Sequence, residues 1–141
     1  MKVLFVCKGN VGRSQLAEGL FNNLTKKHHA ISSGTIAKNK GKLMKNVSIK
    51  NVKILKEVGI DISNKKVKKL NKKMAYSADK IIVFCDRRTW PEFLLKSDKV
   101  ETWISKDTQY MTYKERRVFR NQTKKKIQKL LKELEKDRFI S

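Results

Sequence analysis

The segment CKGNVGRS at residues 7–14 links an apolar run to an amphipathic stretch, and this order constrains the fold more than any other feature. The run KVLFVC before it is nearly continuously apolar and β-branched, as expected of a strand that is buried on both faces. After the segment, apolar residues recur at helical spacing and predict an amphipathic helix from Arg13 to the lysines before His28. A strand that passes into a helix in this way indicates an α/β fold with a parallel sheet.

The rest of the chain continues the alternation of strand and helix signals. Short apolar runs predict three further strands, at residues 28–35, 79–86 and 99–104. Periodicity and composition predict a helix at 47–59, a short basic helix within 65–79, a helical turn at 87–95 and a long helix at 118–139. No linker or internal repeat interrupts this pattern, so we expect one α/β domain over residues 1–141.

Residues 7–14 have the composition of a loop that cradles a tetrahedral oxyanion. Two glycines permit backbone angles at which successive N–H groups turn inward, and the following helix adds the positive end of its dipole. Arg13 supplies a planar fork that can hold two oxygens at once. The residues expected to bind the oxyanion are Lys8, Gly9, Asn10, Val11 and Gly12.

Cys7 lies at the base of this predicted cradle, where N–H donors, the helix dipole and Arg13 all favour the thiolate over the thiol. A thiolate beneath a bound phosphate is a positioned nucleophile, which makes Cys7 a candidate catalytic residue. Ser14 can hydrogen-bond the sulfur and make it a better leaving group when a covalent intermediate breaks down. The alternative interpretation is a buried core cysteine followed by an ordinary glycine turn.

The segment resembles the signature of the low-molecular-weight protein tyrosine phosphatase family, in which a cysteine is followed after five residues by arginine and serine. The likeness includes Gly9 and Asn10 and continues through AISSGT, LKEVGIDIS, SADKIIVF and RNQTKKKIQKLL. The resemblance implies a four-stranded parallel sheet of order 2-1-3-4, flanked by helices. It also implies hydrolysis of phosphomonoesters, with phosphotyrosine in proteins as the leading substrate, through a phosphocysteine intermediate on Cys7.

The family carries its general acid in an Asp-Pro sequence after the fourth strand, and here WISKDTQY occupies that place. The resemblance therefore implies that Asp107 protonates the leaving group and later activates water. Thr108 replaces the family's proline, which leaves the rigidity of this loop open. Asp86 also follows a strand, but it precedes the fourth strand and matches no acid of the family. An aspartate before a threonine is also common in loops and caps, which is the other interpretation of Asp107.

Phosphotyrosine enzymes usually present aromatic faces at the mouth of the pocket, and the loop after Thr35 contains no aromatic residue. Tyr110 and Tyr113 are the remaining candidates, and we assign Tyr110 to the substrate-binding wall. Lys8, beside the nucleophile, would instead attract acidic groups. The sequence therefore leaves the choice of substrate open.

Gln15 follows Ser14 where a proline is usual, and this resembles the thioredoxin-coupled arsenate reductases of the same fold. Under that alternative Cys7 attacks arsenate, and Cys85, near the end of the third strand, is the resolving thiol with thioredoxin as partner. The third cysteine of those enzymes is missing, because Trp90 stands roughly where it is expected. The other interpretation of Cys85 is a residue that fills the core.

The formal net charge of +22 raises a third hypothesis, a non-catalytic module that binds oxyanions or nucleic acid. Most of the 35 basic residues are lysines spread along the chain, and no nucleic-acid-binding motif is present, so we favour a solvated basic face. We expect no cofactor, and no cysteine or histidine spacing suits a metal site. No apolar run reaches the roughly 18 residues that cross a bilayer, so we expect a cytoplasmic protein without membrane contact.

Overall fold

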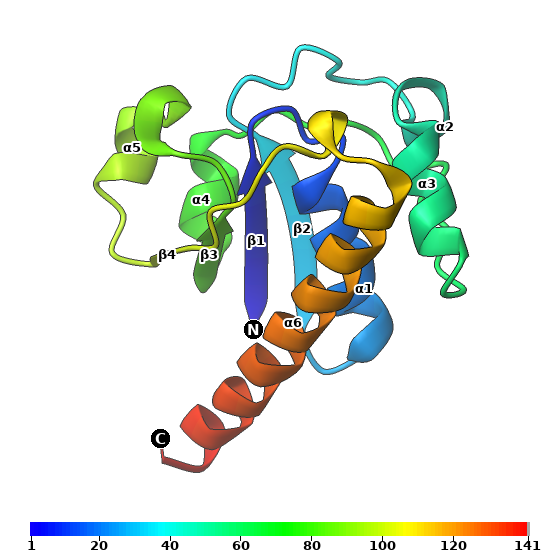
Figure 1. Ribbon diagram of the computed structural model, residues 1–141. Coiled ribbons are helices and arrows are strands. Elements are labelled where there is room, and N and C mark those ends of the chain that lie inside the picture. Colours follow the sequence, from blue (N-terminus) through cyan, green and yellow to red (C-terminus); the bar gives the residue numbers. More distant parts are fainter. Residues whose placement is uncertain (141) are drawn as a thin grey trace.

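The computed structural model describes residues 1–140, with side chains for residues 1–136, and has a parallel sheet with helices on both faces (Figure 1). The strands are β1 (Lys2–Cys7), β2 (His29–Gly34), β3 (Lys80–Val83) and β4 (Val100–Thr102). They hydrogen-bond in the order β2-β1-β3-β4, and every pairing is parallel. The expected α/β class and strand order are confirmed. The expected domain range extends to Ser141, which lies outside the described residues.

Helices and short turns connect the strands and divide between the two faces of the sheet (Figure 1). The helices are α1 (Arg13–Leu24), α2 (Met44–Val47), α3 (Ile49–Lys56), α4 (Lys72–Ser77), α5 (Glu92–Leu95) and α6 (Tyr113–Ile140). The 3-10 turns η1 (Arg87–Thr89) and η2 (Thr108–Tyr110) follow β3 and β4. α1 packs on β1 and β2 and also contacts α3 and α6, whereas α4 contacts β1 and α5. Among the described residues, no helix combines the length and apolarity needed to cross a lipid bilayer.

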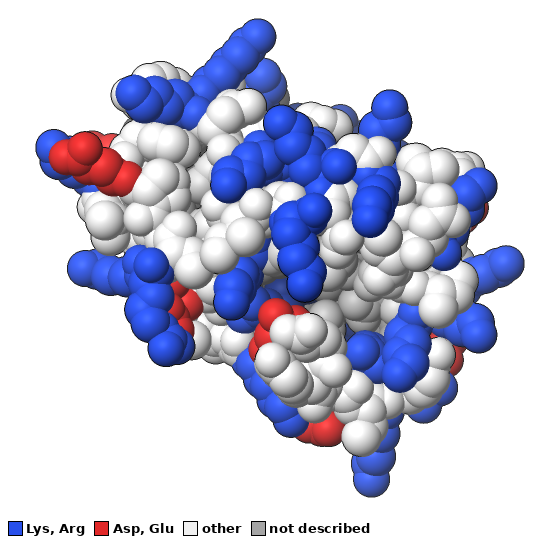
Figure 2. Space-filling view, turned by 90° about the horizontal axis from the view of Figure 1, so that it is seen from above, with Lys and Arg blue, Asp and Glu red and all other residues white. Residues whose placement is uncertain are grey.

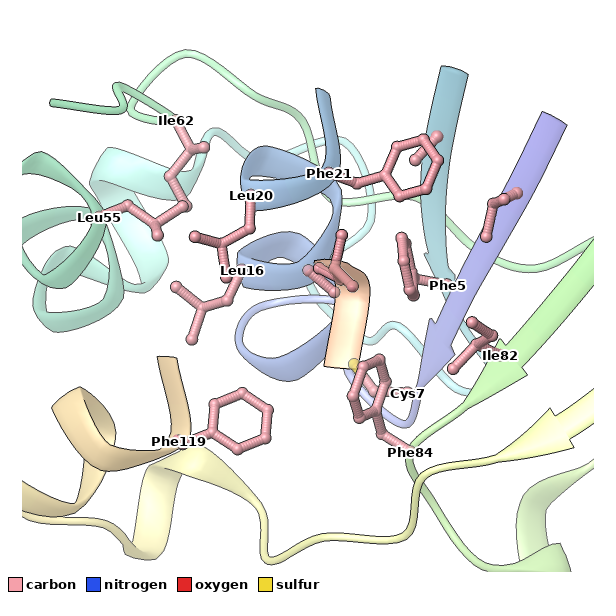
Figure 3. Packing of buried hydrophobic residues seen from close by; sticks show 14 of the residues in the cluster. Phe5, Cys7, Leu16, Leu20, Phe21, Leu55, Ile62, Ile82, Phe84 and Phe119 are labelled. Carbon is pink, nitrogen blue, oxygen red and sulfur yellow. The ribbon is translucent and has the colours of Figure 1, made fainter. Parts of the chain in front are cut away.

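β1 is the centre of the core because both of its faces are buried. Val3, Phe5 and Cys7 join the larger apolar cluster, which also includes residues of α1, α3 and α6 (Figure 3). The side chains between them, Leu4 and Val6, join a second cluster on the other face of the sheet. This double burial explains why the run reads as continuously apolar.

A row of aromatic rings links α6 to the carboxyl end of the sheet. The ring of Phe84, directly after β3, lies 6.1 Å from that of Phe5 in β1 and 6.1 Å from that of Phe119 in α6. Such pairs add about 0.5–1.5 kcal/mol each beyond the area they bury. The side chain of Cys7 lies beside Phe84 (Figure 3), so these rings also support the end of β1.

Two predicted helices differ in extent from those observed. Only Lys72–Ser77 of the basic stretch at 65–79 is helical, because residues before it form isolated bridges with Leu43 and Gly34. α6 begins at Tyr113, five residues earlier than the predicted start at 118. Thr112 and Glu115 explain this start, because each accepts the other's backbone N–H at 3.1 Å in a capping box.

The predicted helix at 47–59 is divided into α2 and α3, which meet at Ser48. The backbone of Ser48 is not helical (φ −150°, ψ 51°). Its hydroxyl donates to the backbone carbonyl of Val11 at 2.5 Å. The kink therefore fastens the start of α3 to the loop at residues 7–14.

The first testable prediction concerns Glu57, which joins α3 to α6. Its carboxylate accepts hydrogen bonds from Arg117 (2.9 Å) and Arg120 (2.8 Å), and these bonds lower its pKa from 4.5 to about 2. A lowered pKa in the folded state stabilises the protein above about pH 4.5, and this contribution is lost as the pH falls toward 2. We expect Glu57→Gln to have a lower Tm than wild type at pH 7, and the difference to shrink below pH 4.5.

Thermal unfolding between pH 2 and pH 7 measures this effect. Glu92→Gln is the matched control, because Glu92 makes a single exposed ion pair, with Lys96 at 2.8 Å. Its Tm change should be smaller than that of Glu57→Gln. A Tm difference for Glu57→Gln that is constant over the whole pH range would contradict the assignment.

Candidate active site

The loop at residues 7–14 lies at the carboxyl end of β1, where the chain passes into α1 (Figure 1). Cys7 is the last residue of β1 and is 2% exposed. Its Sγ accepts a hydrogen bond from the backbone N–H of Asn10 (3.2 Å) and lies 2.9 Å from Oγ of Ser14. The fold thus brings the predicted nucleophile, a backbone donor and the predicted helper serine within hydrogen-bonding distance.

Asn10 holds this loop in shape. Its φ is +58°, in the left-handed region that asparagine tolerates better than most residues. Nδ2 donates to Oγ of Ser14 (2.8 Å) and Oγ of Ser32 (3.0 Å). Oδ1 accepts from Nε2 of Gln15 (3.0 Å) and from the backbone N–H of Lys68 (2.8 Å). The buried amide therefore makes all four hydrogen bonds available to it and ties the loop to α1, β2 and the segment before α4.

A buried carboxylate extends this network. Glu18 in α1 is 3% exposed and accepts a hydrogen bond from Oγ of Ser32 at 3.1 Å. The ammonium groups of Lys65 and Lys68 lie 3.8 Å and 3.7 Å from its oxygens. Burial lowers the pKa of Lys68, against the attraction of Glu18. Buried charges need partners, and here the two lysines and the serine supply them.

Two glycines allow other segments to approach the loop closely. A Cβ at Gly34, the last residue of β2, would lie 2.7 Å from the carbonyl oxygen of Lys8 and 2.9 Å from the amide nitrogen of Asn10. A Cβ at Gly12 would clash with the side chain of Thr108. The turn between β1 and α1 is therefore packed closely against the end of β2 and against η2, with no space for a side chain at Gly12 or Gly34.

Arg13 connects the loop to the ends of β3 and β4. Its Nη1 donates to the backbone carbonyls of Phe84 (3.0 Å) and Ser105 (2.7 Å), and the residue is 5% exposed. Nη2 lies 3.9 Å from a carboxylate oxygen of Asp107. Within the described part of the chain, its Nε donates no hydrogen bond, so one edge of the fork is free to receive an oxyanion.

Asp107 stands at the start of η2, and its neighbour Thr108 fixes it there. Thr108 is 2% exposed, its Oγ1 accepts from Nδ2 of Asn51 at 3.2 Å, and its carbonyl accepts from Nη2 of Arg116 at 2.6 Å. The carboxylate of Asp107 accepts the backbone N–H of Gln109 at 3.0 Å. Hydrogen bonds from α3 and α6 therefore restrain the loop that lacks the family's proline.

A cavity of about 640 Å³ opens beside the loop, and Lys8, Gly9, Val11 and Asp107 line part of it. The sequence-based predictions missed much of the remaining lining, which includes Ile36, Val47, Ile49, Asn51 and Arg116. The sequence does mark Asn51 and Arg116, because both polar residues occupy helix positions that continue the apolar stripes of α3 and α6.

Among the described residues, no cluster of three or more His, Cys, Asp or Glu that could hold a metal ion occurs.

The two candidate tyrosines lie outside the lining of this cavity. Tyr110 ends η2 and is 68% exposed. Tyr113 begins α6, and its ring lies 6.0 Å from the ammonium of Lys50 and 5.9 Å from the guanidinium of Arg116. The assignment of Tyr110 to the substrate wall stays a prediction, and the apolar residues among those described in the cavity lining are aliphatic.

Cys85 and Cys7 are both free thiols, but they belong to different apolar clusters. Cys7 packs with Phe84 in the cluster that includes α1 and α6, whereas Cys85 packs with Trp90 in the cluster on the other face. Burial raises the pKa of the Cys85 thiol, although the nearby Thr89 hydroxyl opposes this. The two cysteines thus lie near the same end of the sheet but on opposite faces.

The strand-to-helix loop thus combines a buried cysteine, a backbone N–H that donates to its sulfur and a buried arginine, which are the features expected of a cysteine-phosphatase loop. Residues 2–139 match the family model described as low molecular weight phosphotyrosine protein phosphatase. The chain therefore belongs to this family, as its sequence resemblance implied.

Individual relatives fall into two groups. A low molecular weight protein tyrosine phosphatase from T. tengcongensis is 30% identical, with a TM-score of 0.80 over 94% of this chain and 99% of that one. Arsenate reductase 2 of Staphylococcus haemolyticus is 32% identical over 83 residues, so the chain spans 59% of the length of that relative. Glutaredoxin arsenate reductase of Synechocystis is 28% identical over 92% of this chain and 95% of its own length.

The close approach at Gly34 generates the second prediction. We expect Gly34→Ala to lower the free energy of unfolding by about 2 kcal/mol, because the new methyl group must displace backbone atoms of the loop. Gly9→Ala is the control, since its Cβ would meet only a side-chain methyl of Val11 at 3.5 Å. Urea unfolding of both variants measures the effect, and equal stabilities would refute the proposed steric requirement.

Proposed function

We propose that this protein is a cytoplasmic phosphomonoester hydrolase that acts through a phosphocysteine, with phosphotyrosine in proteins as its substrate. One observation carries the proposal: Cys7 and Arg13 lie on one loop, where the Cys7 sulfur contacts the Asn10 N–H and the Ser14 hydroxyl, and the Arg13 guanidinium lies 3.9 Å from the carboxylate of Asp107. Membership of the phosphatase family supports it. The proposed location is consistent with two cysteines that remain free thiols, because reducing compartments preserve a nucleophilic thiol.

In the first step of the proposed mechanism, the Cys7 thiolate attacks the phosphorus atom and the bond from phosphorus to the substrate oxygen breaks. Backbone N–H groups of the loop and the Arg13 guanidinium stabilise the negative charge on the phosphoryl oxygens. Asp107 in its acid form donates a proton to the departing oxygen, so that an alcohol or phenol leaves. The product of this step is a phosphocysteine.

In the second step, a water molecule attacks the phosphocysteine while Asp107, now a carboxylate, takes a proton from it. The bond from phosphorus to sulfur breaks, and inorganic phosphate and the thiolate of Cys7 form. Ser14, whose Oγ lies 2.9 Å from Sγ, stabilises this thiolate as it leaves. The hydrogen bond that Ser14 accepts from Asn10 directs the serine hydroxyl proton toward sulfur.

Arsenate reduction is the second candidate function, because named relatives carry that activity. A resolving thiol attacks as its thiolate, and the raised pKa of Cys85 reduces the thiolate fraction at neutral pH. Cys85 also packs in the apolar cluster on the face of the sheet opposite Cys7. Gln15, the residue that first indicated a reductase, has a structural use here, since its Nε2 donates to Asn10 and to the carbonyl of Lys66. These features favour the hydrolase.

The third prediction tests the proposed chemistry with a phosphotyrosyl peptide. We expect wild type to release phosphate, Cys7→Ser to lose turnover while still binding phosphate, and Asp107→Asn to lose about a hundredfold in kcat. Phosphate release measured from mildly acidic to neutral pH tests all three proteins. Substantial residual turnover by Cys7→Ser would reject the phosphocysteine mechanism, and no turnover by wild type would reject the hydrolase.

The fourth prediction separates the two candidate functions through Cys85. We expect Cys85→Ala to release phosphate from the same peptide at the wild-type rate, because Cys85 takes no part in the proposed hydrolysis. Oxidation of NADPH coupled through thioredoxin or glutaredoxin, with arsenate added, measures the competing activity. Arsenate-dependent oxidation by wild type that disappears in Cys85→Ala would instead support the reductase.

A further inference from the structure

The cavity beside the loop is strongly basic. Four cationic residues line it, Lys8, Lys38, Lys50 and Arg116, and Asp107 is its single acidic residue. Lys8, Lys38 and Lys50 are exposed, and none of them forms an ion pair within the part of the chain that the structure describes. Lysines elsewhere on the surface do have carboxylate partners, as in the pairs Lys80 with Glu101 and Lys96 with Glu92. Three exposed lysines of the lining therefore form no ion pair, and Asp107 supplies the one carboxylate among the described lining residues.

The surface around the cavity is also positively charged (Figure 2). Figure 2 views the molecule from the end that carries the loop, and Lys and Arg side chains gather over the middle of this face, where Asp and Glu are few. A formal net charge of +22 adds a long-range positive potential to this local one. An anionic partner is attracted to this end of the molecule before it makes any contact.

Lys38 and Lys50 line the cavity from separate segments of the chain. Lys38 stands in the turn between β2 and α2, and Lys50 stands in the first turn of α3. The ammonium of Lys50 lies 6.0 Å from the ring centre of Tyr113, a contact that restrains its position. An extended segment bound in the cavity would therefore contact lysines from two separate parts of the chain.

The uncharged residues that line the cavity indicate which kind of anionic partner it would bind. Val11, Ile36, Val47 and Ile49 supply aliphatic surface, and none of the described residues that line the cavity is aromatic. Single-stranded nucleic acids are held by basic grooves combined with aromatic rings on which bases stack. Aliphatic surface beside exposed lysines suits a polypeptide with carboxylate side chains instead.

We propose that the protein selects phosphorylated protein segments in which Asp or Glu residues flank the phosphorylated residue, and that Lys38 and Lys50 bind these carboxylates. This inference rests on the proposed phosphatase function and adds a substrate class to it. Lys8, next to the nucleophile, contributes to the same preference from the loop itself. Exposed ion pairs are individually weak and screened by salt, so the preference arises from several lysines acting together.

Two phosphotyrosyl peptides that differ only in flanking residues test the proposal, one with Glu on both sides and one with Gln at the same positions. We expect wild type at low ionic strength to show a kcat/KM about tenfold higher for the Glu peptide, at about threefold per engaged lysine. The ratio should fall toward one in about 0.5 M salt. In the double variant Lys38→Glu with Lys50→Glu, the ratio should fall below one.

The ratio of kcat/KM for the Glu peptide to that for the Gln peptide is taken within one protein. Any change that a substitution makes to the basal rate therefore cancels. The control carries Lys125→Glu with Lys132→Glu, which alters net charge equally at exposed positions on the far part of α6. This control should keep most of the wild-type preference. Equal kcat/KM for the two peptides in wild type would overturn the inference while leaving the hydrolase intact. No phosphate release from either peptide or from p-nitrophenyl phosphate would instead reject the proposed function.

A competition experiment tests whether the cavity binds nucleic acid more tightly than an acidic peptide. Unphosphorylated Glu peptide and a single-stranded oligonucleotide of equal charge are added separately to the reaction. We expect the peptide to inhibit at the lower concentration, because it also contacts the aliphatic lining. Stronger inhibition by the oligonucleotide, relieved in Lys38→Glu with Lys50→Glu, would overturn the proposal in favour of nucleic acid.

Discussion

The buried side-chain amide of Asn10 is the contact on which the site depends. Its φ of +58° carries a conformational cost for a residue with a side chain, of order 1 kcal/mol. Four hydrogen bonds from one amide offset this cost, and they reach α1, β2 and the segment before α4. Because the amide has no unused donor or acceptor, any displacement of the loop breaks a buried hydrogen bond. These hydrogen bonds therefore hold the loop in its turned-in conformation.

This rigidity determines the chemistry available at Cys7. The residue that fixes the backbone also donates its own N–H to the sulfur, and its side chain orients Ser14 toward the same atom. Preorganised donors of this kind need no rearrangement when charge develops on a bound oxyanion. The second half of the site is supported separately, since α3 and α6 restrain Thr108 and, through it, Asp107. The loop and the separately supported Asp107 thus lie beside a cavity whose lining includes residues of α2, α3, η2 and α6.

The sequence predicts the fold best where a local pattern of residues reflects burial or matches a family motif. The buried strands and the strand order were predicted correctly, because burial on both faces produces an apolar run and the family resemblance implies the topology. The extents of α4 and α6 were wrong. Residues 66 and 69 pair as extended chain with segments 23 and 35 positions away, which local periodicity does not record. The start of α6 has a signal in the sequence, since Thr112 and Glu115 have capping-box spacing.

By itself, the sequence determined the β1–loop–α1 unit and the candidate residues within it, because strand, glycine turn, arginine and helix are all encoded within residues 2–24. Tertiary structure decided the rest of the site. Asn51 and Arg116 reach Thr108 from helices far apart in the chain, and Lys38 and Lys50 acquire a common cavity only when their segments fold beside the loop. It also placed Cys85 in the apolar cluster across the sheet from Cys7. These relations depend on packing between distant segments, and no local spacing of residues specifies such packing.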